Sequence, residues 1–81
     1  MNVDEAKGTV MGLIEQIAPD ADVVAMDPER DMRREVDLDS LDFQTLVERV
    51  AEVTGVEIPE TDYPKVRSLQ GMSEYVATHV P

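Results

Sequence analysis

Apolar residues recur every three or four positions in three stretches of this chain, and this spacing constrains its fold more than any other feature. It predicts one helix from about Val3 to Ile17, a second from Ser40 to about Thr54, and a last one from Ser68 or Leu69 to His79. Each helix would carry an apolar stripe along one side. Because such a stripe must be buried against another element, the three helices are expected to pack around a single core.

The residues on these stripes form the predicted core. Gly55 follows the second stripe and is a typical C-cap, and Ser68 precedes the last one as its expected N-cap. Tyr75 is expected at the margin of the last stripe. The predicted inward residues are Val3, Ala6, Val10, Leu13, Ile14 and Ile17 in the first helix, Phe43, Leu46, Val47, Val50, Val53 and Thr54 in the second, and Leu69, Met72, Val76 and Val80 in the last.

About twenty residues separate the first helix from the second, which is long for a connection inside a compact domain. Asp27-Pro28-Glu29 is typical of the start of one short helical turn, with Asp as the cap and Pro in the first position. A further short segment begins at Ile58-Pro59-Glu60 and is interrupted at Tyr63-Pro64. The long connection is expected to be tied to the core by Val23, Val24, Met26, Met32, Val36 and Leu38.

Residues 1–81 are therefore predicted to form one all-α domain, a four-helix bundle of three longer helices and a short third one. The predicted bundle has a long loop between its first and second helices. The residues from Met1 to Glu5 are acidic and lack the features of a signal peptide. No apolar run approaches the roughly 20 residues that span a bilayer. We therefore expect a cytoplasmic protein.

Eighteen acidic residues against seven basic ones give the chain a formal net charge of −11 at pH 7. This charge argues against nucleic acid and anionic membrane surfaces as partners, because both are bound through Lys and Arg. It favours partners with basic surfaces. High acidity with few aromatics is also typical of disorder, but 42% hydrophobic residues at helical spacing oppose that interpretation. The chain has no cysteine, so it has no disulfide, thiol nucleophile or thiolate metal site.

The stretch Asp37-Leu38-Asp39-Ser40-Leu41-Asp42 opens the second predicted helix. Asp39 or Ser40 is a natural N-cap. Asp42 lies in the first turn, where a negative charge favours the positive end of the helix dipole. A helix start also favours a nearby phosphate, so a serine there is suited to carry a phosphodiester. Taken alone, an Asp-Ser pair before an apolar helix usually indicates only a cap.

With these features together, the chain resembles the acyl carrier protein family, the phosphopantetheine-binding carrier proteins. The resemblance runs from about Val3 to Val80. Its most specific part is Asp39-Ser40-Leu41-Asp42, followed by the helix and then by Gly55-Val56-Glu57-Ile58-Pro59. The resemblance implies that Ser40 carries a 4′-phosphopantetheine arm derived from coenzyme A, with Asp39 and Leu41 beside the attachment point.

The same resemblance implies a monomeric carrier rather than an enzyme. Such a carrier holds acyl intermediates as thioesters on its arm and delivers them to enzymes of fatty acid, polyketide or related lipid biosynthesis. The implied partners are a phosphopantetheinyl transferase and acyl-loading, condensing or acyltransferase enzymes with basic docking surfaces. One position departs from the family pattern, which often has Gly two residues before the Asp-Ser pair, where this chain has Asp37.

The second helix is also the expected docking surface for these enzymes. Steps of about 100° per residue place four residues together on the side opposite the inward stripe. These four residues are Leu41, Thr45, Glu48 and Glu52. The resemblance implies that this face, together with Asp42 in the first turn, contacts partner enzymes.

Other functions are less consistent with the sequence. The single histidine, His79, lies two residues from the C-terminus, which argues against a catalytic role. A calcium loop starting at Asp37 fails, because its fifth and sixth positions are Leu41 and Asp42, where an oxygen ligand and a glycine are needed. Two alternatives stay open: a small acidic helical adaptor without a prosthetic group, and an aminoacyl or peptidyl carrier. The one basic cluster either offsets nearby carboxylates or modifies the choice of partner, and it consists of Arg30, Arg33 and Arg34.

Overall fold

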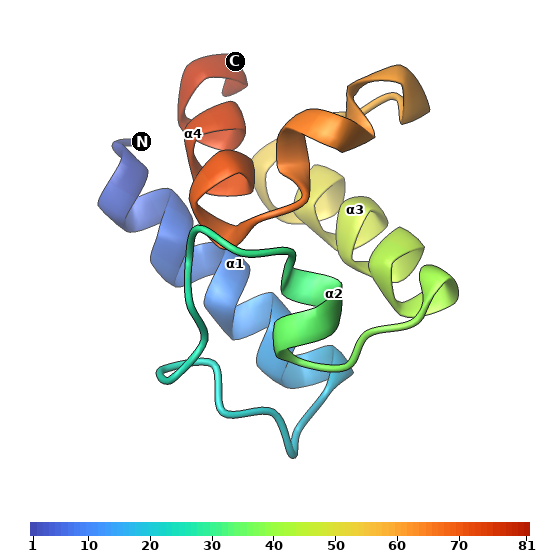
Figure 1. Ribbon diagram of the computed structural model, residues 1–81. Helices are drawn as coiled ribbons and strands as arrows, with labels where there is room; N and C mark the ends of the chain where they lie inside the picture. The colour runs from blue at the N-terminus through green and yellow to red at the C-terminus, as the bar shows by residue number, and fades with distance from the viewer.

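The computed structural model describes all residues 1–81 and is all-helical, with no β-strand. Its elements are α1 (Val3–Ile17), α2 (Met32–Glu35), α3 (Ser40–Thr54), the 3₁₀ helix η1 (Glu60–Val66) and α4 (Leu69–His79). Figure 1 labels the four α-helices, and η1 is the orange segment that leads into α4. The predicted all-α bundle is confirmed, including the bounds of its three longer helices. The short helix inside the long connection is α2. None of the helices has the length and apolar character needed to cross a membrane.

The longer helices enclose one apolar core. α1 packs against both α3 and α4, and η1 packs against α4. In Figure 1 the connection leaves the end of α1, loops outward and returns through α2 to the start of α3. Twenty buried apolar side chains form one continuous cluster. Its large, fully buried members come from every α-helix and include Ile14, Met32, Leu46 and Met72.

Five of the six predicted tethers in the connection are buried, and the sixth prediction is wrong. Val24 is 85% exposed. Val23 and Val24 are neighbours in a turn, which the N–H of Met26 closes by donating to the carbonyl of Val23 (3.4 Å). The turn directs Val23 into the core and leaves Val24 in solvent.

The short helix of the connection starts later than predicted. Asp27 caps only a turn, in which the N–H of Glu29 donates to its carboxylate (2.9 Å) and the N–H of Arg30 to its carbonyl (3.2 Å). The helical turn is α2, and its N-cap is Asp31, whose carboxylate accepts from the N–H of Arg33 (3.0 Å). The position of α2 follows the core, because it is the segment that carries a fully buried apolar side chain, that of Met32.

Two further side-chain predictions are wrong at the edges of the apolar stripes. Val53 is 59% exposed, because it lies about 70° from the centre of the buried stripe of α3 at 100° per residue. Val56 and Ile58 are buried instead and complete that end of the core. Tyr75 is only 8% exposed, and its ring stacks on His79 with the centroids 4.0 Å apart.

The η1 helix is held on two sides. Its predicted interruption at Tyr63-Pro64 is wrong, because the 3₁₀ helix continues through Pro64. The ring of Tyr63 packs edge-on against Phe43 of α3, with the centroids 5.5 Å apart and the planes at 76°. The hydroxyl of Tyr75 donates to the carboxylate of Asp62 (2.6 Å). An aromatic contact therefore joins η1 to α3, and a hydrogen bond joins it to α4.

Candidate functional site

The backbone turns sharply just before α3. Asp37 has a φ of 55° and is the one non-glycine residue with a positive φ. This left-handed conformation costs an L-residue roughly 1–2 kcal/mol, although Asp tolerates it better than most. The next N–H, that of Leu38, donates to the carbonyl of Arg33 (2.9 Å), which closes α2 and leads Leu38 into the core. Glycine adopts this backbone conformation most easily, and Asp37 adopts it here. The turn before α3 therefore forms even though this chain has Asp where the family pattern often has Gly.

Asp39, not Ser40, caps α3. The N–H of Asp42 donates to Oδ1 of Asp39 (2.8 Å), and the N–H of Asp39 donates to Oδ2 of Asp42 (3.3 Å). The two aspartates thus form a reciprocal capping box. Ser40 is the first residue of the helix and is exposed. Its hydroxyl is therefore not used in the cap and stands at a helix N-terminus, where free N–H groups favour an anion.

The predicted docking face of α3 is partly exposed and partly covered. Leu41 is 71% exposed, and Glu48 and Glu52 are exposed as well. Thr45 is half-buried, and its hydroxyl donates to the carbonyl of Leu41 (3.0 Å). Asp42 is half-buried in the capping box. A protein that meets this face therefore encounters an apolar side chain and two carboxylates, while Thr45 and Asp42 act first on the helix itself.

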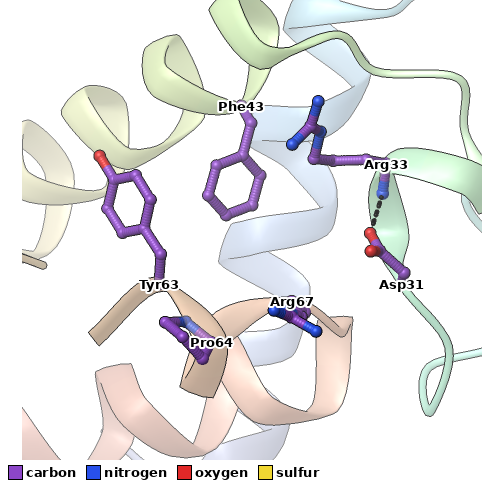
Figure 2. A pocket seen from close by; sticks show the side chains of 6 residues that line it. All are labelled: Asp31, Arg33, Phe43, Tyr63, Pro64 and Arg67. Atoms are coloured by element: carbon purple, nitrogen blue, oxygen red, sulfur yellow. Dashed lines mark hydrogen bonds between the residues drawn. The ribbon is translucent and has the colours of Figure 1, made fainter. Parts of the chain in front are cut away.

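A pocket that the sequence did not predict lies beside the first turns of α3 (Figure 2). Its volume is about 200 Å³. The side chains around it come from α2 and its cap, from α3, and from η1 and the residue after it; they are Asp31, Arg33, Phe43, Tyr63, Pro64 and Arg67. Sequence reasoning assigned Phe43 only to the core and gave Arg67 no role. No local pattern would have revealed the pocket, because only the fold brings these three segments together.

One pair of titratable groups has shifted pKa values. The hydrogen bond from Tyr75 lowers the pKa of Asp62 below its usual 3.8; burial opposes this shift, and the Lys65 ammonium, 3.5 Å from the carboxylate, adds to it. The same hydrogen bond raises the pKa of Tyr75 above 10.0, with a smaller contribution from burial. These groups lie at the contact between η1 and α4, and none of them lines the pocket. No three His, Asp or Glu side chains gather anywhere in the chain in a way that would hold a metal ion.

The chain matches known proteins over most of its length. A family model described as "Phosphopantetheine attachment site" matches residues 9–76. The acyl carrier protein of Rubrobacter xylanophilus is 29% identical over 73 residues, which cover 86% of this chain and 90% of that protein. No solved structure matches the chain. This protein therefore belongs to the acyl carrier protein family, whose attachment domain takes a covalent 4′-phosphopantetheine group.

Proposed function

We propose that Ser40 is the residue that carries 4′-phosphopantetheine. The observation that supports this assignment lies at the start of α3. Asp39 caps the helix, so the Ser40 hydroxyl is free and exposed. A phosphodiester on Ser40 would lie against the free N–H groups of the first turn. It would also lie near the carboxylates of Asp39 and Asp42, but solvent and salt weaken repulsion between exposed charges. The residues present at this helix start therefore fit the group.

The attachment step needs little from this chain beyond a reachable hydroxyl. The Ser40 oxygen forms a bond to the coenzyme A phosphorus that bears the pantetheine. The bond from that phosphorus to the rest of the pyrophosphate breaks, and the nucleotide bisphosphate leaves with the electron pair. The hydroxyl proton passes to a base. Because Asp39 and Asp42 are engaged in the capping box, that base comes from the transferase, together with magnesium.

We further propose that the protein delivers acyl groups to enzymes of fatty acid, polyketide or related lipid biosynthesis. When bound, the prosthetic group supplies a thiol on a flexible arm to which an acyl group can be attached. This chain supplies the attachment point and a surface that partner enzymes recognise. The exposed face of α3, with Leu41, Glu48 and Glu52, fits enzymes that present Arg and Lys around their active sites. Such charges steer encounter and set specificity more than they add affinity.

The proposed cargo is an acyl group. The matching protein of Rubrobacter xylanophilus is named an acyl carrier protein, which favours an acyl cargo over an aminoacyl or peptidyl one. We place the protein in the cytoplasm as a monomer. A monomer is consistent with a core that is complete within one chain, because its large exposed apolar side chains are few and scattered: Met1, Val24, Leu41 and Val53.

The test of Ser40 is modification in vitro. Incubation with coenzyme A and a broad-specificity transferase should add one phosphopantetheinyl group to the wild type and none to Ser40→Ala, as read by intact mass. Circular dichroism of Ser40→Ala provides the control, because Asp39 still caps α3 and the variant should fold. Ser68→Ala is a matched second control that should be modified normally, since Ser68 caps α4 instead. An unchanged mass of the wild type with several transferases would contradict the proposal.

A further inference from the structure

The short helix α2 carries two arginines next to the start of α3. Arg33 and Arg34 are consecutive residues of α2, and both are exposed. The carbonyl of Arg33 accepts from the N–H of Leu38 (2.9 Å), which lies two residues before Ser40. Because two residues span at most about 7 Å of chain, this hydrogen bond holds α2 beside the proposed attachment point.

The side chains of both arginines lie against residues that flank Ser40 in the chain. Arg33 and Arg34 line one surface hollow together with Leu38. Arg33 also lines the pocket beside α3 together with Phe43, three residues after Ser40. Figure 2 shows the guanidinium group of Arg33 extended from α2 toward Phe43. Since residues three apart on a helix are neighbours, Arg33 approaches the first turn of α3.

Neither of these arginines is neutralised by an ion pair within the chain. The two basic residues that pair with carboxylates are Arg30 and Lys65. In a chain with a net charge of −11, two exposed cations without a partner stand out. They are available to an anion that reaches the start of α3.

The carboxylates nearest in the chain are engaged with backbone groups instead. Asp31 accepts a backbone N–H as the N-cap of α2 (3.0 Å). Glu35 accepts from the N–H of Asp27 (2.8 Å). Asp39 and Asp42 form the capping box of α3. These bonds hold the local carboxylates in place, and none of them lies within ion-pair distance of the two arginines of α2.

A phosphodiester is an anion that suits this arrangement. A guanidinium group donates paired N–H groups to phosphate oxygens, and such charge-assisted bonds are stronger than neutral ones. Attachment of the arm at Ser40 would bring one phosphodiester to the first turn of α3. Without a nearby cation, this added negative charge would meet repulsion from a strongly acidic chain.

We propose that Arg33 and Arg34 are positioning residues for the arm and that they pair with the phosphate on Ser40. This inference rests on the proposed attachment at Ser40. The two guanidinium groups hold the base of the arm on the α2 side of the helix start. The proposed docking face of α3, which includes Leu41, then stays open to partner enzymes.

Thermal unfolding with and without the arm tests the pairing. Coenzyme A and a broad-specificity transferase modify the wild type to completion, and intact mass confirms one phosphopantetheinyl group on each chain. The melting temperature at low salt should then rise by about 2–6 °C, the shift expected from one or two exposed ion pairs in a domain of this size. The rise should shrink in high salt, because salt screens exposed charges.

Variants assign this rise to the two arginines. Arg33→Gln with Arg34→Gln, also modified to completion, should lose most of the rise. Replacement of both by Lys keeps the charges and should retain a salt-sensitive part of it. The matched control is Arg30→Gln with Arg49→Gln, which removes two exposed arginines that line neither hollow. This control should show the same rise as the wild type.

Phosphorus NMR reads the surroundings of the phosphate directly. At low salt, the phosphodiester resonance of the wild type should differ from that of the glutamine double variant, and the two should converge in high salt. The control double variant should give the wild-type resonance. A purely structural role of the arginines would lower the melting temperature equally with and without the arm and would leave the resonance unchanged, and this result would overturn the inference.

The outcomes separate this inference from the proposed function. Failure of the wild type to be modified would count against Ser40, and mass shows it before any melting experiment. Normal modification with no rise in melting temperature would overturn the inference alone. An equal rise in the wild type and the glutamine double variant would also overturn it, because the N–H groups of the helix start would then account for the rise.

Discussion

The hydroxyl of Tyr75 on α4 donates a hydrogen bond of 2.6 Å to the carboxylate of Asp62 on η1. The bond lowers the pKa of Asp62 and raises the pKa of Tyr75. It is charge-assisted while Asp62 is ionised and Tyr75 is protonated, which makes it stronger than a bond between neutral groups. Because no side chain caps η1, this bond is a specific polar contact that holds the short helix in place.

Tyr75→Phe should reduce stability in a way that depends on pH. A carboxyl group whose pKa is lower in the folded state contributes stability above its unfolded pKa and loses it as the pH falls through the folded pKa. The unfolded value is near 3.8, so the contribution of Asp62 is complete at pH 7 and disappears in strong acid. The urea midpoint of the variant should therefore lie below that of the wild type at pH 7, and the gap should close as the pH falls below 3.8.

The control for this experiment is Tyr63→Phe. This change also removes a tyrosine hydroxyl, from a residue of η1, but it leaves the hydrogen bond between Tyr75 and Asp62 intact. Its stability relative to wild type should not change with pH. The pKa of Tyr75 is shifted in the opposite direction, upward. Its contribution to the free energy of unfolding is therefore complete below pH 10 and is lost as the pH rises through the folded pKa. A gap between Tyr75→Phe and wild type that is constant from pH 7 into strong acid would contradict the assigned coupling.

Alanine should have opposite effects at two helical glycines. A Cβ at Gly71 would lie 2.5 Å from the carbonyl oxygen of Lys65, so α4 and the end of η1 must move apart, at a cost on the order of 1–3 kcal/mol. A Cβ at Gly12 in α1 would meet nothing within 4 Å, so Gly12→Ala should gain about 0.5–1 kcal/mol from better helix propensity. Urea unfolding of both variants measures the difference. Equal stability of Gly71→Ala and wild type would show that the close approach is absent in solution.

Substitutions of Asp37 should report the left-handed turn before α3. Asp37→Ala should lose on the order of 1 kcal/mol, because alanine has no local polar contact to ease a positive φ. Asp37→Gly should be at least as stable as Asp37→Ala, since relief of strain outweighs the greater freedom of glycine in the unfolded chain. Chemical unfolding compares the two. Should the alanine variant prove the more stable, the backbone at this position would not be left-handed in solution.

Reversal of Glu48 and Glu52 to Lys should slow the association of partner enzymes at low salt. Both carboxylates are exposed on α3, where they would act on the proposed partners through long-range attraction to basic surfaces. The rate of arm transfer against ionic strength should therefore be lower and less salt-dependent than in the wild type. Arg49→Ala, a change at another exposed α3 position, should have a smaller effect. If the double reversal is loaded as fast as wild type at low salt, α3 is not the docking element.

Leu41→Ala should weaken docking by a different route. This side chain is 71% exposed, so its removal should change the free energy of unfolding by no more than about 0.5 kcal/mol. Its loss removes apolar area from the docking face, and the loss of transfer rate should persist at every salt concentration. Val24→Ala is a suitable control, because Val24 is equally apolar and 85% exposed but lies in the long connection. Equal loading by both variants would argue against a role for Leu41.

Local signals were sufficient to predict the long helices. The 3.6-residue spacing of apolar side chains places α1, α3 and α4, and residues such as Gly55 and Ser68 mark where the last two of these end or begin. These signals act within one turn of the helix, so they do not depend on the rest of the fold. The position of Ser40 at the start of α3 was therefore predictable, although the choice of Asp39 over Ser40 as the cap was not.

Features that depend on contacts between distant segments were missed. Asp27 and Asp31 both carry cap signals, and only the burial of Met32 distinguishes them. Tyr75 was expected at the margin because its sequence neighbours do not reveal the bond to Asp62. The pocket was missed for the same reason: Arg33 and Arg67 are 34 positions apart in the chain and meet only in the folded structure.

The contact between the long connection and the start of α4 has a consequence for the order of folding. The N–H of Met32 donates to the carbonyl of Arg67, and the N–H of Gln70 donates to the carbonyl of Pro28 (2.9 Å). Both bonds close loops of more than thirty residues, so their entropic cost is met only after the helices between them have assembled. During synthesis, the segment before Ser40 would thus find its partner only after the start of α4 has left the ribosome. A transferase that needs a firmly held α3 start would then distinguish the folded domain from one whose α4 has not yet been made.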